Sequence, residues 1–514
     1  MLLEITSMVN TTYILVFLTL IVITLYELLT NYKNIILGNV IPSIKGHFFG
    51  IIQVYIEGPE KYLPNMLKIG QASQFSTCKS WMLNHLFVYI FDPEEIKEVL
   101  NNPEIFKKSK DYVIIKDSIF GNGLFTEQDI TLWRKYRKKA VDALKISFVK
   151  LFIPIFFEET LILGQILMKK RDVNSYNCEI SEAINNATMD IFGRTTIGEN
   201  FSAQKNSRHV FLENAKVIKN VWSYRIFNPW FISPILFRMS KWKKKHDAST
   251  RKIQKFTDDL VTKQNQILDN NLNIKNIEGS HDDEKNHKTL IKFLLENNDM
   301  LSYEQIRDNV INAIFAGQDT TSIGIACSLF MLAHHQDVQN KLVEELNEIY
   351  SSDDSCKFPS YEDLCKMKYL ECIIKETLRL YPPIPYIGRE VSKQTKIGKY
   401  IIPKGSTVSI LPTIVHLNPQ LYLDPEKFNP DNFLPDVCHK RHPYSFIPFS
   451  GGFRNCAGIK YSMVQMKTII STLVRFYHFS PSDNCPTPDK LQTAFAGLLI
   501  FVDGCYVKIK HRKL

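Results

Sequence analysis

The longest helical pattern in the sequence constrains the fold most strongly. Residues Tyr303 to His335 have the spacing of a single helix, which would be about 50 Å long at about 1.5 Å per residue. The stretch from Val310 to Ala333 is apolar on nearly every face, as is typical of a helix inside a large core. A chain of 514 residues that is 45% hydrophobic can supply that core.

The rest of the chain also reads as mostly helical, with a few short strand-like runs. A capping box that starts at Ser360 opens a helix that Pro382 ends. The polar, asparagine-rich stretch 262–288 predicts a long exposed loop. Because no linker or internal repeat divides this part of the chain, we expect one large, mainly α unit with minor β-structure over residues 51–514.

A membrane anchor is predicted at the N-terminus. Residues Ile5 to Tyr26 carry no charge, and about 20 apolar residues cross a bilayer as a helix. A cleaved signal peptide is the alternative, but Glu4 stands where basic residues belong and no A-x-A-like site follows. The first lysine, Lys33, comes after the span, which places the body in the cytosol. We predict an anchor over 1–35 and a hinge over 36–50.

Charge and cysteine content exclude several classes of protein. The net charge of +10 fits an anionic membrane surface or an acidic partner protein. No nucleic-acid partner is expected, because no long basic arm or nucleic-acid module is present. The ten cysteines are scattered and form no C-x-x-C pair, which indicates a reducing compartment rather than a disulfide framework.

The stretch "FSGGFRNCAG", Phe449 to Gly458, places one cysteine among three glycines and an arginine. Helical spacing follows it, so Cys456 lies at a helix N-terminus, where free N–H groups stabilise a thiolate. A cysteine protease would need a partner histidine with a local signature, and zinc would need more ligands nearby. A thiolate beside the cation of Arg454 suits haem iron, whose propionates are anionic.

This stretch matches F-x-x-G-x-R-x-C-x-G, and the chain therefore resembles the cytochromes P-450. The resemblance implies a single large helical domain with small β-sheets behind an N-terminal transmembrane helix. It also implies haem b as the cofactor, with Cys456 as the axial ligand of the iron and with Phe449 and Arg454 in contact with the haem.

A polar stretch, "AGQDTTS", interrupts the apolar central helix from Ala316 to Ser322. Local hydrogen bonds to the preceding turn are one explanation for such residues in a helix. The stretch also matches the oxygen-groove motif A-G-x-[DE]-T of the same family. The resemblance implies that Asp319 relays protons from solvent, that Thr320 hydrogen-bonds the bound oxygen or a water, and that Gly317 lets the helix open beside the haem.

"KETLRLYPPIP" places Glu376 and Arg379 three residues apart on one helix face. A solvated surface pair is the alternative interpretation. Within the resemblance the two residues match E-x-x-R, a buried structural pair that braces the cysteine loop. Asn432 stands where the family usually has a third partner, an arginine, which leaves that part of the brace open.

"WRKYR" supplies Trp133 and Arg137, which match the W-x-x-x-R helix of the family. The resemblance implies that both contact a haem propionate, as do Arg389 and Arg454, and arginine suits bidentate pairing with carboxylates. Core packing and a solvated face are the alternatives for the first two. The other basic residues of the same helix, at 134, 135, 138 and 139, would dock an acidic reductase if they lie on the thiolate side of the haem.

The run "PEKFNPDNFLPDVCHKRHPYSFIPFS" resembles the insect branch of the family-four fatty-acid ω-hydroxylases. Many members carry a glutamate, which can link covalently to haem, where this chain has Ala316. An ester to haem cannot form from alanine, so selectivity for the terminal carbon of a substrate does not follow from the resemblance. The segment 221–246 joins aromatic residues to lysines, as either a second membrane contact or a packed helix with a basic face.

We expect a haem-thiolate monooxygenase in the endoplasmic reticulum membrane, with its catalytic domain facing the cytosol. It would insert one oxygen atom from O₂ into a lipophilic substrate, such as a fatty acid, a steroid-like or juvenile-hormone-like lipid, or a foreign compound. Electrons would come from NADPH through a separate reductase, with cytochrome b5 as a further partner. The alternatives are a haem-thiolate isomerase or dehydratase, or a non-catalytic haem-binding protein, neither of which needs the Asp319–Thr320 relay.

Overall fold

The computed structural model describes residues 36–44, 51–82, 85–206, 208–278, 289–295, 301–350 and 358–512. Across these ranges, no helix combines the length and the apolar character that a bilayer span requires. The predicted anchor over 1–35 lies outside the described residues.

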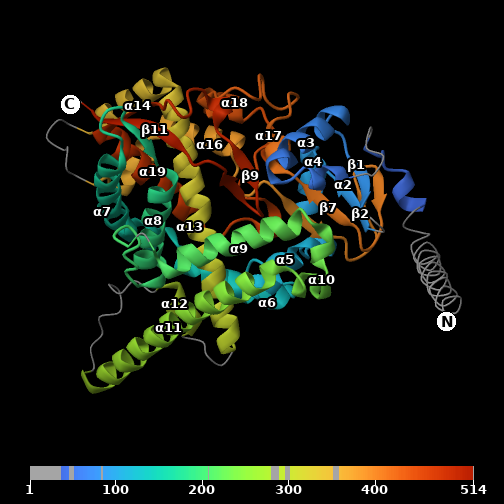
Figure 1. Cartoon of the computed structure of the whole chain (residues 1–514), viewed down its shortest axis with the longest axis horizontal. Coiled ribbons are helices and arrows are strands. Elements are labelled where there is room, and N and C mark those ends of the chain that lie inside the picture. The colour runs from blue at the N-terminus through green and yellow to red at the C-terminus, as the bar shows by residue number, and fades with distance from the viewer. Residues whose placement is uncertain are drawn as a thin grey trace, which may run out of the picture.

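The predicted central helix is present as α13, Tyr303–His334. It begins at a capping box in which Ser302 and Gln305 each bond the other's backbone. Most of its side chains from Val310 to Ala333 are buried. It runs through the middle of the molecule, where it packs on α8 (Ser181–Phe192), α19 (Ile459–Phe476) and α16 (Lys368–Leu380) (Figure 1). The helix is apolar on every face because protein surrounds it.

The strands of the described residues form four small sheets. The largest has the order β1-β2-β7-β4, made of Cys78–Met82, His85–Tyr89, Thr407–Ile410 and Ile387–Glu390, and only its β2–β7 pair is parallel. Figure 1 shows this sheet with α3 and α4 at one end of the molecule, and α7, α8 and α19 toward the other. The chain is thus mainly helical with minor sheet, as its sequence predicts.

The remaining α-helices are α2 Ile52–Ile56, α3 Pro59–Ala72, α4 Pro93–Leu100, α5 Val113–Ile115, α6 Ile130–Ala143, α7 Ile146–Lys170, α9 Val210–Ile226, α10 Pro234–Arg238, α11 Lys241–Glu278, α12 Leu290–Leu295, α14 Gln336–Ile349, α15 Tyr361–Lys366, α17 Pro412–His416 and α18 Pro435–Cys438. The remaining strands are β3 Asn177–Glu179, β5 Thr395–Ile397, β6 Tyr400–Ile402, β8 Tyr477–Pro481, β9 Thr493–Phe495, β10 Leu499–Phe501 and β11 Tyr506–His511. Short 3-10 and π turns join them, among them η2 Lys110–Tyr112, η5 Pro229–Ile232 and η10 Gly452–Arg454.

Two local predictions were wrong. The stretch 262–288 is not a loop as far as the structure describes it, because α11 continues to Glu278. Propensity is a weak determinant, and a helix already nucleated by packing against α9 extends through asparagines at little cost. The helix that opens at Ser360 also breaks at Met367, whose ψ of 74° separates α15 from α16.

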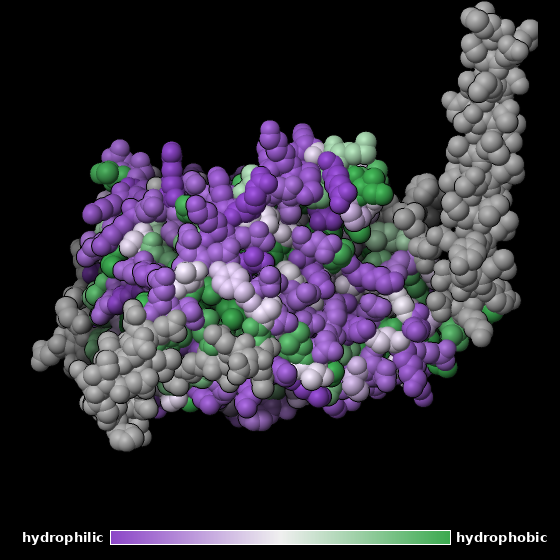
Figure 2. Space-filling view, turned by 90° about the horizontal axis from the view of Figure 1, so that it is seen from below, coloured by the Kyte–Doolittle hydropathy of each residue, from purple (hydrophilic) through white to green (hydrophobic). Residues whose placement is uncertain are grey.

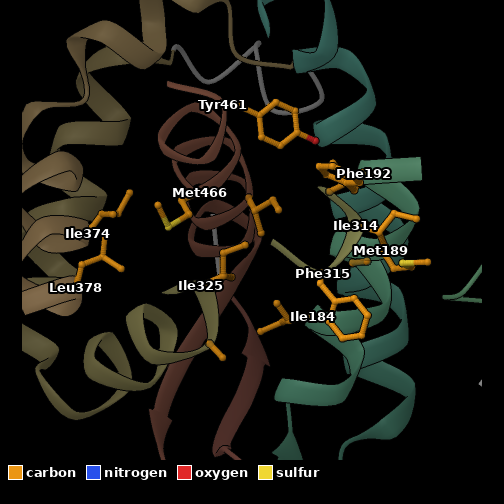
Figure 3. Packing of buried hydrophobic residues seen from close by; sticks show 14 of the residues in the cluster. Ile184, Met189, Phe192, Ile314, Phe315, Ile325, Ile374, Leu378, Tyr461 and Met466 are labelled. Atoms are coloured by element: carbon orange, nitrogen blue, oxygen red, sulfur yellow. The ribbon is translucent and has the colours of Figure 1, made fainter. Parts of the chain in front are cut away.

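The core around α13 is closely packed. The rings of Phe192 of α8 and Tyr461 of α19 are edge to face, with their centres 6.2 Å apart, and Figure 3 shows Phe192 between Tyr461 and the pair Ile314 and Met189. Adding a Cβ to Gly324 of α13 would bring it within 2.9 Å of the Met466 sulfur. By contrast, the face of the molecule in Figure 2 is mostly hydrophilic, with small hydrophobic areas between charged side chains.

Candidate active site

The cysteine loop is held directly before α19. The backbone N–H of Cys456 donates to the carbonyl of Phe449 at 2.9 Å, which closes the loop. The N–H of Gly458, the residue before the helix, donates to the Cys456 sulfur at 3.3 Å. The sulfur therefore receives one of the free donors of the helix N-terminus, as the sequence predicts.

Gly452 shows why this loop needs glycine. Its φ is +60°, a value that disfavours residues with a side chain. A Cβ at this position would overlap the backbone carbonyl of Leu100. The loop can therefore approach α4 only if this residue has no side chain.

Burial dominates the ionisation of Cys456. Its side chain is accessible, but it lies deep among protein atoms, and burial raises the pKa of the thiol above its usual value. The Gly458 N–H and the Arg137 cation oppose this pKa shift without cancelling it. The sequence led us to expect that the helix N-terminus stabilises a thiolate, but the helix N-terminus alone does not lower the pKa of Cys456 below its usual value. A bound cation such as iron would be needed to favour the charged form.

Arg137 and Arg454 flank the ring of Trp133. The guanidinium of Arg137 lies 5.4 Å from the centre of that ring, and the guanidinium of Arg454 lies 5.5 Å from it. Arg137 also donates to the Asn455 carbonyl at 2.6 Å, so α6 lies directly against the cysteine loop. Trp133 is buried and meets Phe106 edge to face at 5.1 Å. The structure thus brings Trp133, Arg137 and Arg454 together beside Cys456.

A second group of cations lies under the same loop. Arg389 of β4 and Lys108 are buried, and they face each other across a β-bridge. Burial, and after it the charge of Arg389, lowers the pKa of Arg454 to about 9 and that of Lys108 well below its usual value. No salt bridge in the described part of the chain involves Lys108, Arg389 or Arg454.

Buried cations without carboxylate partners are costly unless an anion joins them. A haem bound through Cys456 would bring two propionates, so these residues fit that cofactor. Lys108 could not be found from the sequence, because it stands in a lysine-rich run, 107–110, that reads as a solvated face. Its bridge to β4, its burial and its contacts with the rings of Tyr112 and Phe125 show that its side chain points inward.

Glu376 and Arg379 form a fully buried pair. Their side chains are 0% exposed and lie 2.7 Å apart, so the surface alternative is excluded. Arg379 also donates to the carbonyls of His416, Pro425 and Lys427. Asn432 donates its amide to Glu376 at 3.2 Å, which gives the pair a neutral third partner instead of an arginine.

The polar residues of α13 make two kinds of contact, one within the helix and one with another helix. The Thr320 hydroxyl donates to the Ala316 carbonyl at 2.7 Å, which is the local hydrogen bond that the alternative interpretation predicts. Asp319 instead makes a tertiary ion pair, since its Oδ1 lies 2.7 Å from Nζ of Lys219 on α9. Its Oδ2 is buried without a hydrogen bond to any described residue.

Gly317 lies where α13 and α8 approach closely. The ring of Phe192 occupies the space that a Cβ would take there, and α13 remains a continuous helix through this point. On another face of the helix, Ala316 is exposed and Thr320 is half-buried. The close contact with Phe192 therefore requires a glycine at position 317, independently of any opening of the helix beside a cofactor.

An apolar cavity adjoins the cations. Its walls are mainly aromatic and aliphatic side chains from α3, β2, α5, η5, β9 and the residues before β4. Tyr112 and Phe125 belong to these walls, and their rings lie 4.5 and 4.1 Å from Nζ of Lys108. The arrangement places a space for a lipophilic molecule next to the anion-binding residues.

Two surfaces are relevant to the expected reductase and membrane contacts, the basic face of α6 and the segment 221–246. Arg134, Lys135 and Lys138 of α6 are exposed on the helix that holds Arg137 against the cysteine loop, whereas Lys139 is half-buried and donates to the Phe293 carbonyl. The segment 221–246 combines both predicted characters. Trp222 and Phe237 are buried, and the exposed apolar residues gather at η5 and α10, namely Trp230, Ile235, Leu236 and Met239.

Comparisons with known proteins agree on the family. The family model "Cytochrome P450" matches residues 46–502. "Cytochrome P450 4c3" of Drosophila melanogaster is 32% identical over 437 residues, which is 83% of this chain and 80% of that protein. "Cytochrome P450 4c21" of Blattella germanica is 31% identical over 399 residues, 77% of this chain and 78% of that protein.

Among solved structures, the "Crystal structure of cytochrome P450DA heme domain" superposes with a TM-score of 0.77. The match covers 92% of this chain and 98% of that one at 19% identity, so it bears on the fold alone.

Proposed function

Since this chain belongs to the cytochrome P450 family, is related to its family-four members and is a monooxygenase, we propose that it oxidises a lipophilic substrate in the endoplasmic reticulum membrane with electrons that a separate reductase takes from NADPH. The observation that carries the proposal is the accessible sulfur of Cys456 beside buried cations that lack carboxylate partners. A haem bound there supplies O₂ activation at its iron.

Each proposed residue has a role that its contacts support. Cys456 would hold the iron, and Phe449 would close the loop around it. Trp133, Arg137, Arg389, Arg454 and Lys108 would position the propionates. Glu376 and Arg379 would brace the loop without touching the cofactor.

Proton delivery would run along α13. Oδ2 of Asp319 has no hydrogen bond within the described residues and can accept a proton, while Lys219 holds the other oxygen. Thr320 would have to turn its hydroxyl away from Ala316 before it could donate toward the site. Such a relay favours oxygenation over isomerisation, dehydration or simple haem binding.

Two surfaces support the proposed location and partners. The exposed apolar residues of η5 and α10 would dip into the membrane interface beside the lysines that follow them. The basic face of α6, the helix that meets the cysteine loop through Arg137, would dock an acidic reductase, with cytochrome b5 as a further candidate for the same face. The anchor over 1–35 would tether the domain that follows residue 51.

The ligand assignment is tested with reduced protein and carbon monoxide. Thiolate-ligated haem gives a Soret band at ~450 nm, and Cys456→Ala should abolish it. Cys365→Ala, which removes an exposed cysteine elsewhere, should leave it unchanged. A Cys456→Ala protein that keeps the band would overturn the assignment.

A further inference from the structure

The apolar cavity has one charged group in its walls. Of the described residues that line it, Asp111 alone carries a carboxylate or a cationic side chain. Asp111 belongs to the short turn η2, two residues before α5, and shares the cavity with four tyrosines, Tyr55, Tyr62, Tyr112 and Tyr386. An acidic group in an apolar wall is costly, which calls for an explanation.

The surroundings satisfy this carboxyl group only in part. Its Oδ1 is buried and forms no hydrogen bond within the described residues, whereas the hydroxyls of Ser109 and Tyr386 and the Asp111 backbone N–H interact with the carboxyl group and oppose the effect of burial on its pKa. Burial raises the pKa of Asp111, and the Lys108 cation opposes the change only weakly. Lys108 moreover faces Arg389 and Arg454, where it would serve the propionates.

A polar group of the substrate would complete these contacts. A hydroxyl can donate to the carboxyl when it is ionised and can also accept from it when it is protonated. A substrate carboxylate would instead meet the like charge of ionised Asp111, because Lys108 lies against the rings of Tyr112 and Phe125 without lining the cavity itself. An ammonium group would have to compete with the Lys108 cation beside it.

We propose that Asp111 is a specificity-determining residue that selects lipophilic substrates with a hydroxyl group and rejects free fatty acids. The inference rests on the proposed function, because it assumes that the cavity receives the substrate.

The test compares dodecanol with dodecanoate, which share one chain length and differ at the polar end. Binding to the oxidised holoenzyme is followed by the change in the haem spectrum, which needs neither reductase nor turnover. Dodecanol should bind the wild type about tenfold tighter than dodecanoate. Asp111→Asn, which keeps the shape and removes the charge, should bring the two affinities together, mainly by tightening dodecanoate.

Two variants control the result. Asp111→Glu keeps the charge and should keep the preference for the alcohol, whereas Asp117→Asn removes an exposed carboxylate nearby and should change nothing. Equal affinities in the wild type, or an unchanged ratio in Asp111→Asn, would overturn the inference. The carbon monoxide band is recorded for every protein, so a wild type without it would refute the proposed function instead.

Discussion

His416 should make the stability of this protein depend on pH. The residue ends α17 and is fully buried. Its Nδ1 donates to the Arg379 carbonyl at 3.0 Å, and its Nε2 accepts the Ile447 N–H at 2.9 Å. The neutral imidazole therefore links the buried Glu376–Arg379 pair to the segment that leads into the cysteine loop. A second ring proton would leave the Ile447 N–H without an acceptor.

The size of the effect follows from the pKa. Burial lowers the pKa of His416 from 6.5 to about 3. As the pH falls, the unfolded chain binds this proton before the folded protein does. The contribution of His416 to the free energy of unfolding is therefore fully present above pH 6.5 and is lost as the pH drops from there toward 3. Between pH 7 and pH 5 the loss from this residue amounts to about 2 kcal/mol.

Urea unfolding at each pH, followed by tryptophan fluorescence, measures the effect. His416→Gln should be less stable than the wild type at pH 7, but its free energy of unfolding should fall by about 2 kcal/mol less on going to pH 5. Other histidines whose pKa is lowered, such as the half-buried His85, contribute equally to both proteins and cancel. His439→Gln, at an exposed position, should retain the wild-type dependence. If His416→Gln shows the wild-type slope, His416 is not held neutral in the folded protein and the reasoning fails.

Three further outcomes are expected. Lys108→Met should weaken haem retention about tenfold by removing one cation from the propionates, measured as haem transfer to apomyoglobin, and unchanged retention would contradict its role. Lys219→Met should leave the carbon monoxide band intact but alter the fraction of NADPH that yields product, because Asp319 loses its ion pair; unaltered coupling would remove Asp319 from the relay. Lys135→Glu with Lys138→Glu should raise the reductase concentration for half-maximal turnover about fivefold at low salt, and an effect that persists at high salt would argue against electrostatic docking.

The sequence predicted the features that depend on residues close to one another along the chain. The length of α13, the start of α19 and the capping box at Ser360 each depend on residues within a few positions of one another. Glu376 and Arg379 were recognised as a pair for the same reason, since they lie one turn apart. Their burial, however, depends on segments far along the chain.

What sequence could not reveal involves partners that are distant along the chain. Lys219 and Asp319 are 100 residues apart, and nothing in either neighbourhood names the other. Lys108 is held inward by a bridge to Arg389, which is 281 residues further along the chain, and by its contacts with the rings of Tyr112 and Phe125. α11 likewise continues through its asparagines to Glu278, and the helix packs against α9, a contact that no window of sequence contains.

The substitution at Asn432 can be understood from charge balance around the cysteine loop. Glu376 and Arg379 form an ion pair with no net charge, and burial keeps His416 beside them uncharged. An arginine in place of Asn432 would add a buried positive charge to this side of the loop, whereas the amide supplies a hydrogen bond and no charge. The backbone N–H of Asn429 provides a further donor to the same carboxylate at 2.8 Å. The brace can therefore hold Glu376 without a second arginine, and buried positive charge remains on the opposite side, where the propionates would neutralise it.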